Sequence, residues 1–332
     1  MPGGADVLVT SLMHALKQTQ HEVELLRLPF LFAPEQAIHA QMDYCEQLDL
    51  QAPNGQPIDL LLSLQFPGYG IHHPHHRIWL MHQHRAAYEL APTIAETPAQ
   101  KALKERIHQY DQQHLQQAEK RFTISQRVAQ RIQDTTQLPA QAVYHPPAGE
   151  ANFYCAEAWD YVFYPSRLET LKRQELLIEA ARYLRTPLKI LIAGDGGQAQ
   201  HYQQRIIELG VEDRVQLMGR ITEKQKLACY AHALAVAFIP WDEDLGYITL
   251  EAMLAAKPLV TCHDSGGPLE FVQDQHTGLV CTPDPRALAE AFDQLYLDKK
   301  KAYAMGQAGR QAYQDLNLSW QHTLSQLLGD AP

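Results

Sequence analysis

The stretch ALAVAFIPWDEDLGYITLEAMLAAKPLVTCH (233–263) decides the fold class, because it passes from one apolar strand through a loop and a helix into another. We predict strands at 233–240 and 258–263, and the residues TLEAMLAA between them are strong helix formers. Strands that are apolar throughout are typical of parallel sheets that helices cover on both faces. The stretch therefore predicts a βαβ unit in an α/β protein.

The same alternation of apolar runs and amphipathic segments extends along the chain in both directions. Amphipathic helices are predicted at 5–18 and 173–184. The remaining predicted strands are 21–29, 58–66, 77–82, 121–125, 142–146, 160–166, 188–194, 214–219 and 278–282.

The segment HPPAGEANFYCAEAWD (145–160) interrupts this rhythm with two prolines and a glycine, which indicates a domain boundary. We therefore expect two doubly wound, Rossmann-like lobes, at 1–147 and 148–315. An amphipathic helix within 316–332 ends the chain, and it either crosses back to the first lobe through Trp320 or packs on its own lobe. Since open α/β sheets bind ligands beyond the carboxyl ends of their strands, the cleft between two such lobes is the expected site.

Composition excludes several classes of protein. The 332 residues are 45% hydrophobic, so the chain is not disordered, and no apolar run reaches the roughly 20 residues of a membrane span. A net charge of -10 argues against nucleic acid as a partner. The five cysteines are widely spaced, which argues against a disulfide framework or a structural zinc site. The N-terminus lacks the pattern of a secretory signal, so we expect a cytoplasmic protein.

Gly246 stands where a helix is predicted to begin, after the strand that ends at Pro240. The unpaired amides of Gly246, Tyr247 and Ile248, together with the helix dipole, would favour a phosphate. Glu243 and Glu251 bracket this turn, and each could accept hydrogen bonds from a pair of sugar or ribose hydroxyls. On spacing alone, a solvated acidic loop and an ordinary helix glutamate remain the alternative.

A second signal is YPSRLETLKRQELLIEA (164–180), where Arg167 and Lys172 flank a short loop between a strand and a helix. Two cations beyond a strand's carboxyl end suit a diphosphate, which carries more charge than one helix terminus neutralises. Two exposed surface cations are the alternative for this segment taken alone.

The order SRLETLK, IAGDG, VQLMGR, EDLGYITLEAM, SGGPLEFV and TGLV resembles the donor-binding half of family 4 glycosyltransferases, which have the GT-B fold. The resemblance spans roughly residues 160–320. It is more diffuse over 1–150, where GGAD, LMHQHR and FTIS match the general layout. It implies retaining transfer of a sugar from a UDP- or GDP-linked donor, with no metal and no other cofactor.

The resemblance also implies roles for individual residues. Arg167 and Lys172 would hold the diphosphate, Glu243 the donor sugar and Glu251 the ribose. The remaining contacts with the donor would come from Gly3, Gly4, Gly194, Gly219, Arg220, Gly246, Tyr247 and Ile248.

Four features depart from the family pattern. Leu245 replaces an aromatic residue, Asp244 replaces a proline, and Arg173 stands where the family commonly has glycine. These leave the sugar's identity open. The helix at 5–18 also follows Gly3 and Gly4 directly, with no strand before it, so either the N-terminal lobe lacks its first strand or the true start of the protein lies upstream.

Histidines are concentrated in the first half of the chain. The tract IHHPHH (71–76) could bind zinc, but Pro74 interrupts it and no cysteine or acidic residue is near, which favours a polar loop. His82 follows a predicted strand end, as does a family histidine that contacts the donor sugar or assists the acceptor; a structural histidine is the alternative. His84 and Arg85 are candidates for the acceptor side.

The sequence leaves the acceptor open between a glycan, a lipid-linked molecule and a small molecule. A lipid-linked acceptor would place the protein at the inner face of a membrane, although no basic amphipathic helix demands it. Two other functions remain: a nucleotide-sugar-binding protein with impaired catalysis, motivated by the missing strand, and a GT-B-like nucleotide-sugar epimerase.

Overall fold

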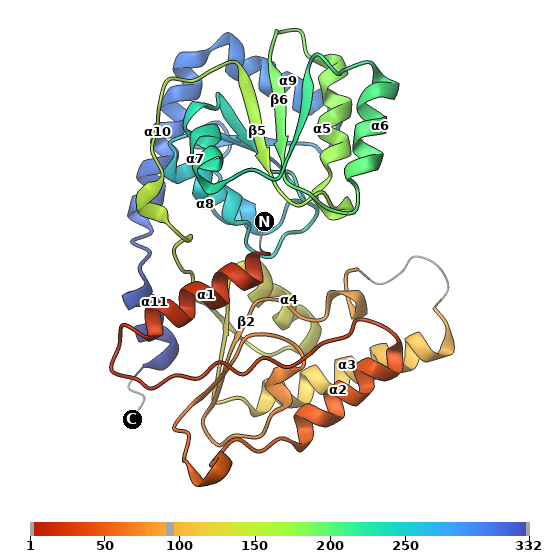
Figure 1. Ribbon diagram of the computed structural model, residues 1–332, viewed down its shortest axis with the longest axis vertical. Helices are drawn as coiled ribbons and strands as arrows, with labels where there is room; N and C mark the ends of the chain where they lie inside the picture. The colour runs from red at the N-terminus through yellow and green to blue at the C-terminus, as the bar shows by residue number, and fades with distance from the viewer. Residues whose placement is uncertain (1–2, 91–95, 330–332) are drawn as a thin grey trace. The chain divides into compact units, whose positions relative to one another are not determined.

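The computed structural model describes residues 3–90 and 96–329 (Figure 1). Their contacts form two compact units. The unit that we call the C unit contains residues 3–8 and 146–318, and the N unit contains residues 9–145 and 319–329.

The C unit is built on a parallel sheet whose strands lie in the order β10-β9-β8-β5-β6-β7. Counted from β5, this is the doubly wound order 3-2-1-4-5-6 read backwards, and the direction of winding switches between β5 and β8. The predicted strands of this half of the chain are thus confirmed. Their bounds are β5 (Tyr161–Pro165), β6 (Lys189–Ala193), β7 (Val215–Gly219), β8 (Ala235–Ala237), β9 (Leu259–Cys262) and β10 (Gly278–Cys281).

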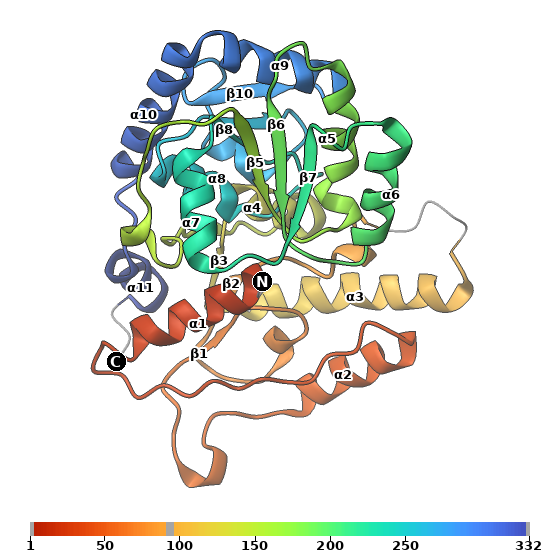
Figure 2. The same cartoon turned by 45° about the horizontal axis from the view of Figure 1, so that its top comes forward.

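Helices cover both faces of this sheet (Figures 1 and 2). α5 packs against α9 and α6, whereas α8 packs against α10. Strands β5 and β8 are buried along their whole length, as expected for strands between two helical layers. The helices are α5 (Gln174–Ala180), α6 (Ala199–Leu209), α7 (Glu223–His232), α8 (Tyr247–Leu254), α9 (Pro285–Leu297) and α10 (Lys299–Asp315).

The N unit contains a second parallel sheet, in the order β1-β2-β3-β4. Every residue of β2 is buried, and Tyr69, Ile107 and Tyr110 lie in the core beside it. The strands are β1 (Leu61–Ser63), β2 (His76–Leu80), β3 (Lys120–Thr123) and β4 (Gln141–Ala142). The helices are α2 (Glu35–Gln47), α3 (Pro98–Gln117), α4 (Gln126–Thr136), α11 (Trp320–Leu328) and the part of α1 (Gly4–Leu16) from residue 9 onward, since residues 4–8 belong to the C unit.

The strand predicted at 21–29 is wrong. The segment does not pair with either sheet, and Leu25 and Leu26 are 41% and 53% exposed. Its apolar side chains find no buried face, so nothing compensates for the cost of ordering a strand there. The backbone nearby is held by a side chain of α2 instead: Gln41 accepts a hydrogen bond from the amide of Leu31 at 3.3 Å. In the described residues no strand precedes α1.

The last helix, α11, packs within the N unit. The Trp320 ring lies edge-on to Trp79, with ring centroids 6.4 Å apart. The hydroxyl of Thr323 donates to the carbonyl of Tyr144 at 2.8 Å. The final described turn is tied to β2 as well, because Arg77 donates to the carbonyl of Leu327 at 3.1 Å.

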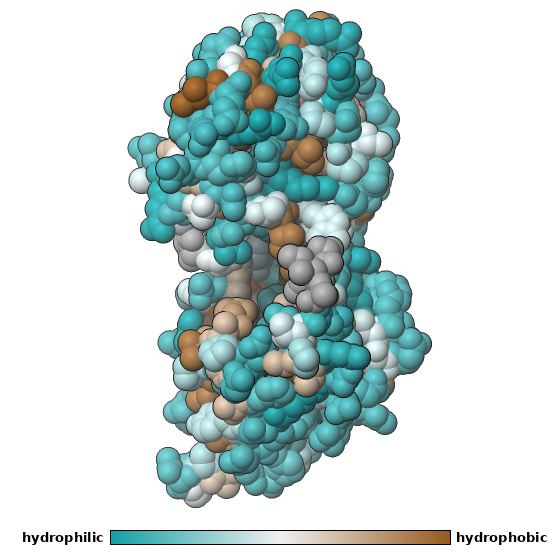
Figure 3. Space-filling view, turned by 90° about the vertical axis from the view of Figure 1, so that its right-hand side faces the viewer, coloured by the Kyte–Doolittle hydropathy of each residue, from teal (hydrophilic) through white to brown (hydrophobic). Residues whose placement is uncertain are grey.

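Hydrophilic residues cover most of the face shown in Figure 3, and hydrophobic residues occur there in small groups. Within the described ranges, the search for a helix long and apolar enough to cross a bilayer finds none.

Candidate functional site

Two loops of the C unit meet at the switch point of its sheet. The loop at 166–173 follows β5, and the loop at 238–246 follows β8, the neighbouring strand on the other side of the switch. Ligands of doubly wound sheets bind at this place, beyond the carboxyl ends of the strands. The sequence-predicted residues Arg167, Lys172, Glu243 and Gly246 all lie on these two loops.

Lys172 and Glu243 join the loops, since the Lys172 ammonium donates directly to the Glu243 carboxylate. Their side chains are 15% and 20% exposed, so the pair is largely screened from water but still reachable. The ammonium also lies 5.6 Å from the centre of the Phe238 ring. An ammonium held this way is positioned to exchange its carboxylate partner for a phosphate.

The loop SGGP (265–268) fixes the backbone of Glu243. The Glu243 amide donates to the carbonyl of Ser265 at 2.9 Å, and the Gly267 amide donates to the carbonyl of Glu243 at 2.8 Å. Gly266 has a φ of 72°, and a Cβ there would lie 2.5 Å from the Glu243 carbonyl oxygen. These glycines therefore serve a close approach between two stretches of this chain's own backbone.

Gly246 directly precedes the first residue of α8 and has a φ of 86°. A Cβ at this position would lie 2.7 Å from Phe238, so only glycine fits without a shift of that ring. The first amides of α8, those of Tyr247 and Ile248, stand at its N-terminal end, where a helix attracts anions. A Cβ on Gly4 would contact the Tyr247 ring at 3.5 Å, so the start of α1 approaches the same place.

Glu251 is held by two side chains of α7 that sequence reasoning missed. Its carboxylate accepts from the Lys226 ammonium at 3.0 Å and from the Tyr230 hydroxyl at 2.5 Å, and it is 13% exposed. Burial alone would lower the pKa of Lys226, but the carboxylates of Glu251 and Glu223 outweigh burial and raise it. No spacing in the sequence points from α7 to α8, so these partners could be found only in the fold.

Gly194, Gly219 and Arg220 lie together at the carboxyl ends of β6 and β7. The Gly194 amide donates to the carbonyl of Gly219 at 2.8 Å. A Cβ on Gly194 would lie 2.0 Å from the carbonyl oxygen of Ser166, so this turn lies against the loop that follows β5. Arg220 is 72% exposed and donates to Asp195, which lowers the pKa of that carboxyl.

Arg167 shares its loop with Lys172 but is oriented differently. Its side chain is 56% exposed and lies 3.9 Å from Glu169. The Arg167 carbonyl accepts from the side chain of Gln174 at 2.7 Å, which fixes the backbone at this point. The structure therefore brings Lys172 to Glu243 and leaves Arg167 on the exposed side of the loop.

Arg173, a departure from the family pattern, has a structural explanation. Its φ is 53°, a conformation that glycine adopts most readily. The guanidinium donates to both carboxylate oxygens of Asp264 at 2.8 Å and to the carbonyls of Ile239 and Pro240 at 2.7 Å. Although burial acts to raise the pKa of Asp264, the hydrogen bonds from Arg173 hold it below its usual value. The arginine thus ties the loop after β5 to the end of β8.

In the N unit, His82 lies two residues beyond β2 and is half-buried. Its Nδ1 lies 2.7 Å from the carbonyl oxygen of Gln83. His84 lies among aromatic rings, 5.2 Å from the centre of Phe66 and 6.3 Å from that of Phe32, onto which it stacks. Burial, with the charge of His82 in second place, lowers the pKa of His84. Both histidines therefore stand near a strand end, as the sequence predicted.

The side chains of the histidine tract at 71–76 have separate partners, but the tract is not simply a polar loop, because His76 begins β2 and both His73 and His76 are buried. His76 lies 2.8 Å from the Ser63 hydroxyl, His73 lies 2.9 Å from the Ile58 carbonyl, and His75 lies 3.4 Å from Glu119. Among the described residues, no cluster of three or more His, Cys, Asp or Glu side chains could hold a metal ion.

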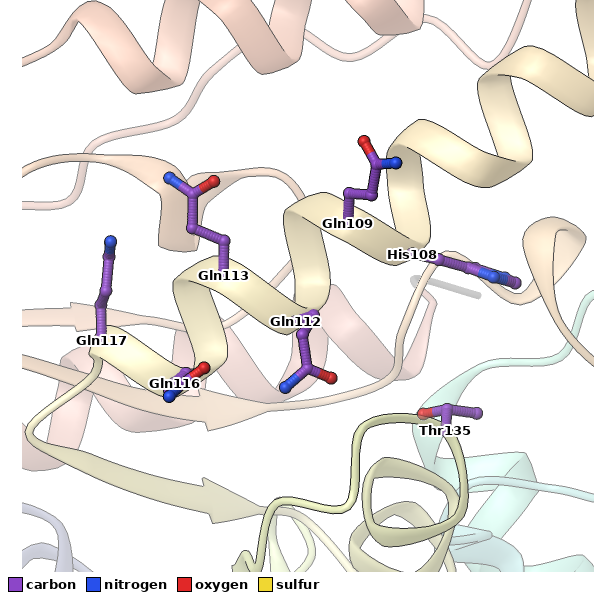
Figure 4. A pocket seen from close by; sticks show the side chains of 7 residues that line it. All are labelled: His108, Gln109, Gln112, Gln113, Gln116, Gln117 and Thr135. Carbon is purple, nitrogen blue, oxygen red and sulfur yellow. The ribbon is translucent and has the colours of Figure 1, made fainter.

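A hollow of about 730 Å³ lies beside α3 in the N unit (Figure 4). Gln112 and Gln116 extend toward the side on which Thr135 lies, whereas Gln109 and Gln113 point the other way. The hollow is therefore open, and its amide groups do not by themselves identify a ligand.

Comparison with known proteins identifies the C unit. Residues 157–312 match the family model described as "Glycosyl transferases group 1". The C unit thus resembles the group 1 glycosyltransferases over these residues. Among curated relatives, it is 34% identical over 116 residues to the alpha-1,3/1,6-mannosyltransferase ALG2 of Dictyostelium discoideum, a match that covers 35% of this chain and 27% of that protein. The chain spans less than half the length of the curated relatives that it matches.

Solved glycosyltransferase structures share the fold over both units. Sucrose-phosphate synthase from Thermosynechococcus elongatus matches with a TM-score of 0.76 at 18% identity, over 98% of this chain and 92% of that one. The Anabaena protein HepE, solved with UDP and glucose, matches with a TM-score of 0.71 at 17% identity, over 98% and 95%. The α/β fold is therefore the GT-B fold of these glycosyltransferases, as the sequence predicted.

Proposed function

We propose that this chain is a retaining glycosyltransferase that moves a sugar from a UDP- or GDP-linked donor to a glycan, lipid-linked or small-molecule acceptor without a divalent metal. One observation carries the proposal: Lys172 and Glu243 meet at the switch point of a doubly wound sheet, beside the glycine that starts α8. This places a cation, a carboxylate and a helix N-terminus where such sheets bind ligands.

The departing nucleoside diphosphate gains negative charge as its bond to the sugar breaks. In this proposal Lys172, Arg167 and the first amides of α8 stabilise that charge, the role that a divalent ion has in other transferases. On donor binding, Lys172 turns from Glu243 to the diphosphate, and the released carboxylate accepts hydrogen bonds from the sugar hydroxyls. The acceptor oxygen bonds to the anomeric carbon on the face from which the diphosphate leaves, and its proton passes to the departing phosphate oxygen, so the anomeric configuration is retained.

The other residues complete the donor contacts in this proposal. Glu251 accepts from the ribose, and the backbone at Gly219 and Arg220 contacts the base. From the N unit, His82 hydrogen-bonds a hydroxyl of a substrate. The names of two matched proteins support a sugar nucleotide as the donor, since ALG2 is a mannosyltransferase and the HepE structure holds UDP and glucose.

The test is donor turnover by the full chain. UDP-glucose, UDP-N-acetylglucosamine and GDP-mannose are incubated with a panel of acceptors, with and without EDTA, and the released UDP or GDP is measured. We expect turnover that EDTA leaves unchanged and a product whose anomeric configuration, determined by NMR, is that of the donor. Lys172→Ala should lower kcat/KM by about 100-fold, the usual cost of removing one group that stabilises transition-state charge.

Lys224→Ala is the matched control, because Lys224 is an exposed lysine of α7 in the same unit. It should keep the wild-type rate. Full activity of Lys172→Ala would contradict the proposed role of Lys172 in stabilising the departing diphosphate. Binding of UDP or GDP without turnover of any sugar donor would favour a binding protein, and conversion of the donor to another nucleotide sugar without acceptor would favour an epimerase.

A further inference from the structure

Asp111 of α3 is a fully buried carboxyl group in the N unit that the proposed reaction does not use. It accepts hydrogen bonds from the hydroxyl of Tyr69, from the hydroxyl of Tyr88 at 2.7 Å and from the side-chain amide of Gln83 at 3.1 Å. Burial raises the pKa of Asp111, and the three hydrogen bonds oppose that rise. A buried carboxyl group is costly to a fold unless its hydrogen bonds are satisfied, so this cluster is a defined polar network.

Gln83 connects this network to the strand end that carries His82. Its side chain is 4% exposed and lies between two helices, because its amide also donates to the Thr135 hydroxyl of α4 at 3.2 Å. With the side chain anchored to both α3 and α4, the Gln83 backbone has little freedom. Its carbonyl oxygen is the atom that lies 2.7 Å from Nδ1 of His82.

That contact selects a tautomer of His82. A carbonyl oxygen can only accept a hydrogen bond, so Nδ1 must carry the proton. In the neutral ring the other nitrogen, Nε2, then presents a lone pair. A lone pair at Nε2 can accept a hydrogen bond from a hydroxyl group, whereas the opposite tautomer would have to donate one.

We propose that Asp111 is a positioning residue. By anchoring Gln83, it holds the Gln83 carbonyl in place, and this carbonyl fixes the tautomer of His82. In that tautomer His82 can accept a hydrogen bond from a substrate hydroxyl. This inference deepens the proposed function and depends on it for the substrate. Asp111 touches no substrate in this scheme and acts only through Gln83. Tyr69 and Tyr88 hold the carboxylate in place, and Thr135 holds the other side of the amide.

The test uses a readout that a purely structural residue would not change. In the full chain labelled with ¹⁵N, long-range ¹H–¹⁵N correlations report which ring nitrogen of His82 carries the proton. We expect the Nδ1–H tautomer in the wild type, and a shift to mostly Nε2–H in Asp111→Ala and in Gln83→Ala. In both variants kcat should fall about tenfold while KM for the donor stays within twofold, since His82 remains present but carries its proton on Nε2 instead of Nδ1.

Asp111→Asn should restore most of the Nδ1–H tautomer of His82 and most of kcat. Its amide oxygen can still accept hydrogen bonds from the tyrosines, and Gln83 can turn its own oxygen to accept from the new amide. Gln83→Ala is the variant that leaves the Asp111–Tyr69–Tyr88 contacts in place, so it keeps the test open if Asp111→Ala does not fold. Gln113→Ala, an exposed glutamine of α3, is the matched control and should change neither readout.

The two proposals can fail separately. Wild-type protein that turns over no sugar nucleotide contradicts the proposed function, and the tautomer measurement then still decides the positioning of His82. An active wild type whose Gln83→Ala variant keeps both the Nδ1–H tautomer and kcat overturns the role of Asp111.

Discussion

Two polar sites, one in each unit, are held in opposite ways. In the C unit, charges are paired across the loops at the switch point, with Lys172 on Glu243 and Arg173 on Asp264. In the N unit, His76 is buried at 7% exposure against the hydroxyl of Ser63, and burial lowers its pKa to about 4.

This difference has a physical meaning. A paired cation can exchange its carboxylate for a phosphate at little cost, and the proposed function uses the Lys172–Glu243 pair in this way. A buried neutral histidine or a network of hydroxyl and amide groups fixes geometry without attracting charge. In the proposed function, the charged pairs of the C unit supply electrostatics and the neutral groups of the N unit supply fixed hydrogen-bonding positions, and three variants test this comparison.

Arg173→Gly should have the largest effect on stability, although glycine suits the φ of 53°. The variant loses the two-oxygen contact with Asp264 and the contacts with two carbonyls, and it leaves a partly buried carboxylate unpaired. Breaking such a pair costs about 4 kcal/mol, and the relief of backbone strain recovers about 1 kcal/mol of it. We expect a loss of about 3 kcal/mol in the free energy of unfolding of the C unit, measured by hydrogen exchange in urea.

The pH dependence of the same variant gives an independent check. The pKa of Asp264 is lowered in the folded state, so its stabilisation is present above the unfolded pKa of about 4 and is lost as pH falls through the folded pKa. Arg173→Gly should remove this acid-dependent loss. A variant as stable as the wild type at pH 7 would show that the ion pair does not hold these loops together.

The sequence predicted the C unit well because its signals are local. Buried parallel strands appear as continuous apolar runs, and the glycine before α8 marks a helix start with a special φ. The candidate site residues on the loops after β5 and β8 could be placed on these loops for the same reason, since the strand ends that precede them were visible in the sequence.

What the sequence could not show are contacts between distant segments. Lys226 and Glu251 lie 25 positions apart, and Asp111 meets Tyr69 across 42. Nothing in the spacing of such residues distinguishes partners from ordinary surface charges. The strand expected at 21–29 failed for a related reason: its apolar residues are present, but strand formation depends on a buried face that only the fold provides.

Gly246→Ala should destabilise the C unit by about 2 kcal/mol, less than the loss of the Arg173 contacts. The added Cβ must be accommodated at a φ of 86° and 2.7 Å from Phe238, so backbone strain and a displaced ring both contribute. Thermal unfolding of the C unit measures the loss. Gly197→Ala is the control, since a Cβ there meets nothing within 4 Å, and it should stay within about 0.5 kcal/mol of the wild type. Equal stability of the two variants would mean that residue 246 does not need glycine.

The smallest expected effect concerns His76 in the N unit. Its pKa is about 4 in the folded state because of burial, with the charges of His73 and His114 contributing, against 6.5 in the unfolded chain. Below pH 6.5 the His76 ring therefore binds a proton in the unfolded chain but not in the folded one. The contribution of His76 to the free energy of unfolding is thus complete above pH 6.5 and declines as pH falls toward 4. At pH 5.5 the loss from this one residue is about 1 kcal/mol.

Hydrogen exchange of the N unit at pH 7.5 and 5.5 should show that loss in the wild type and a smaller one in His76→Gln, while the exposed control His21→Gln keeps the wild-type difference. The C unit should lose nothing through Asp264 over the same range, because that carboxyl titrates only at lower pH. A wild-type N unit that is equally stable at both pH values would remove the contrast between neutral and paired buried groups.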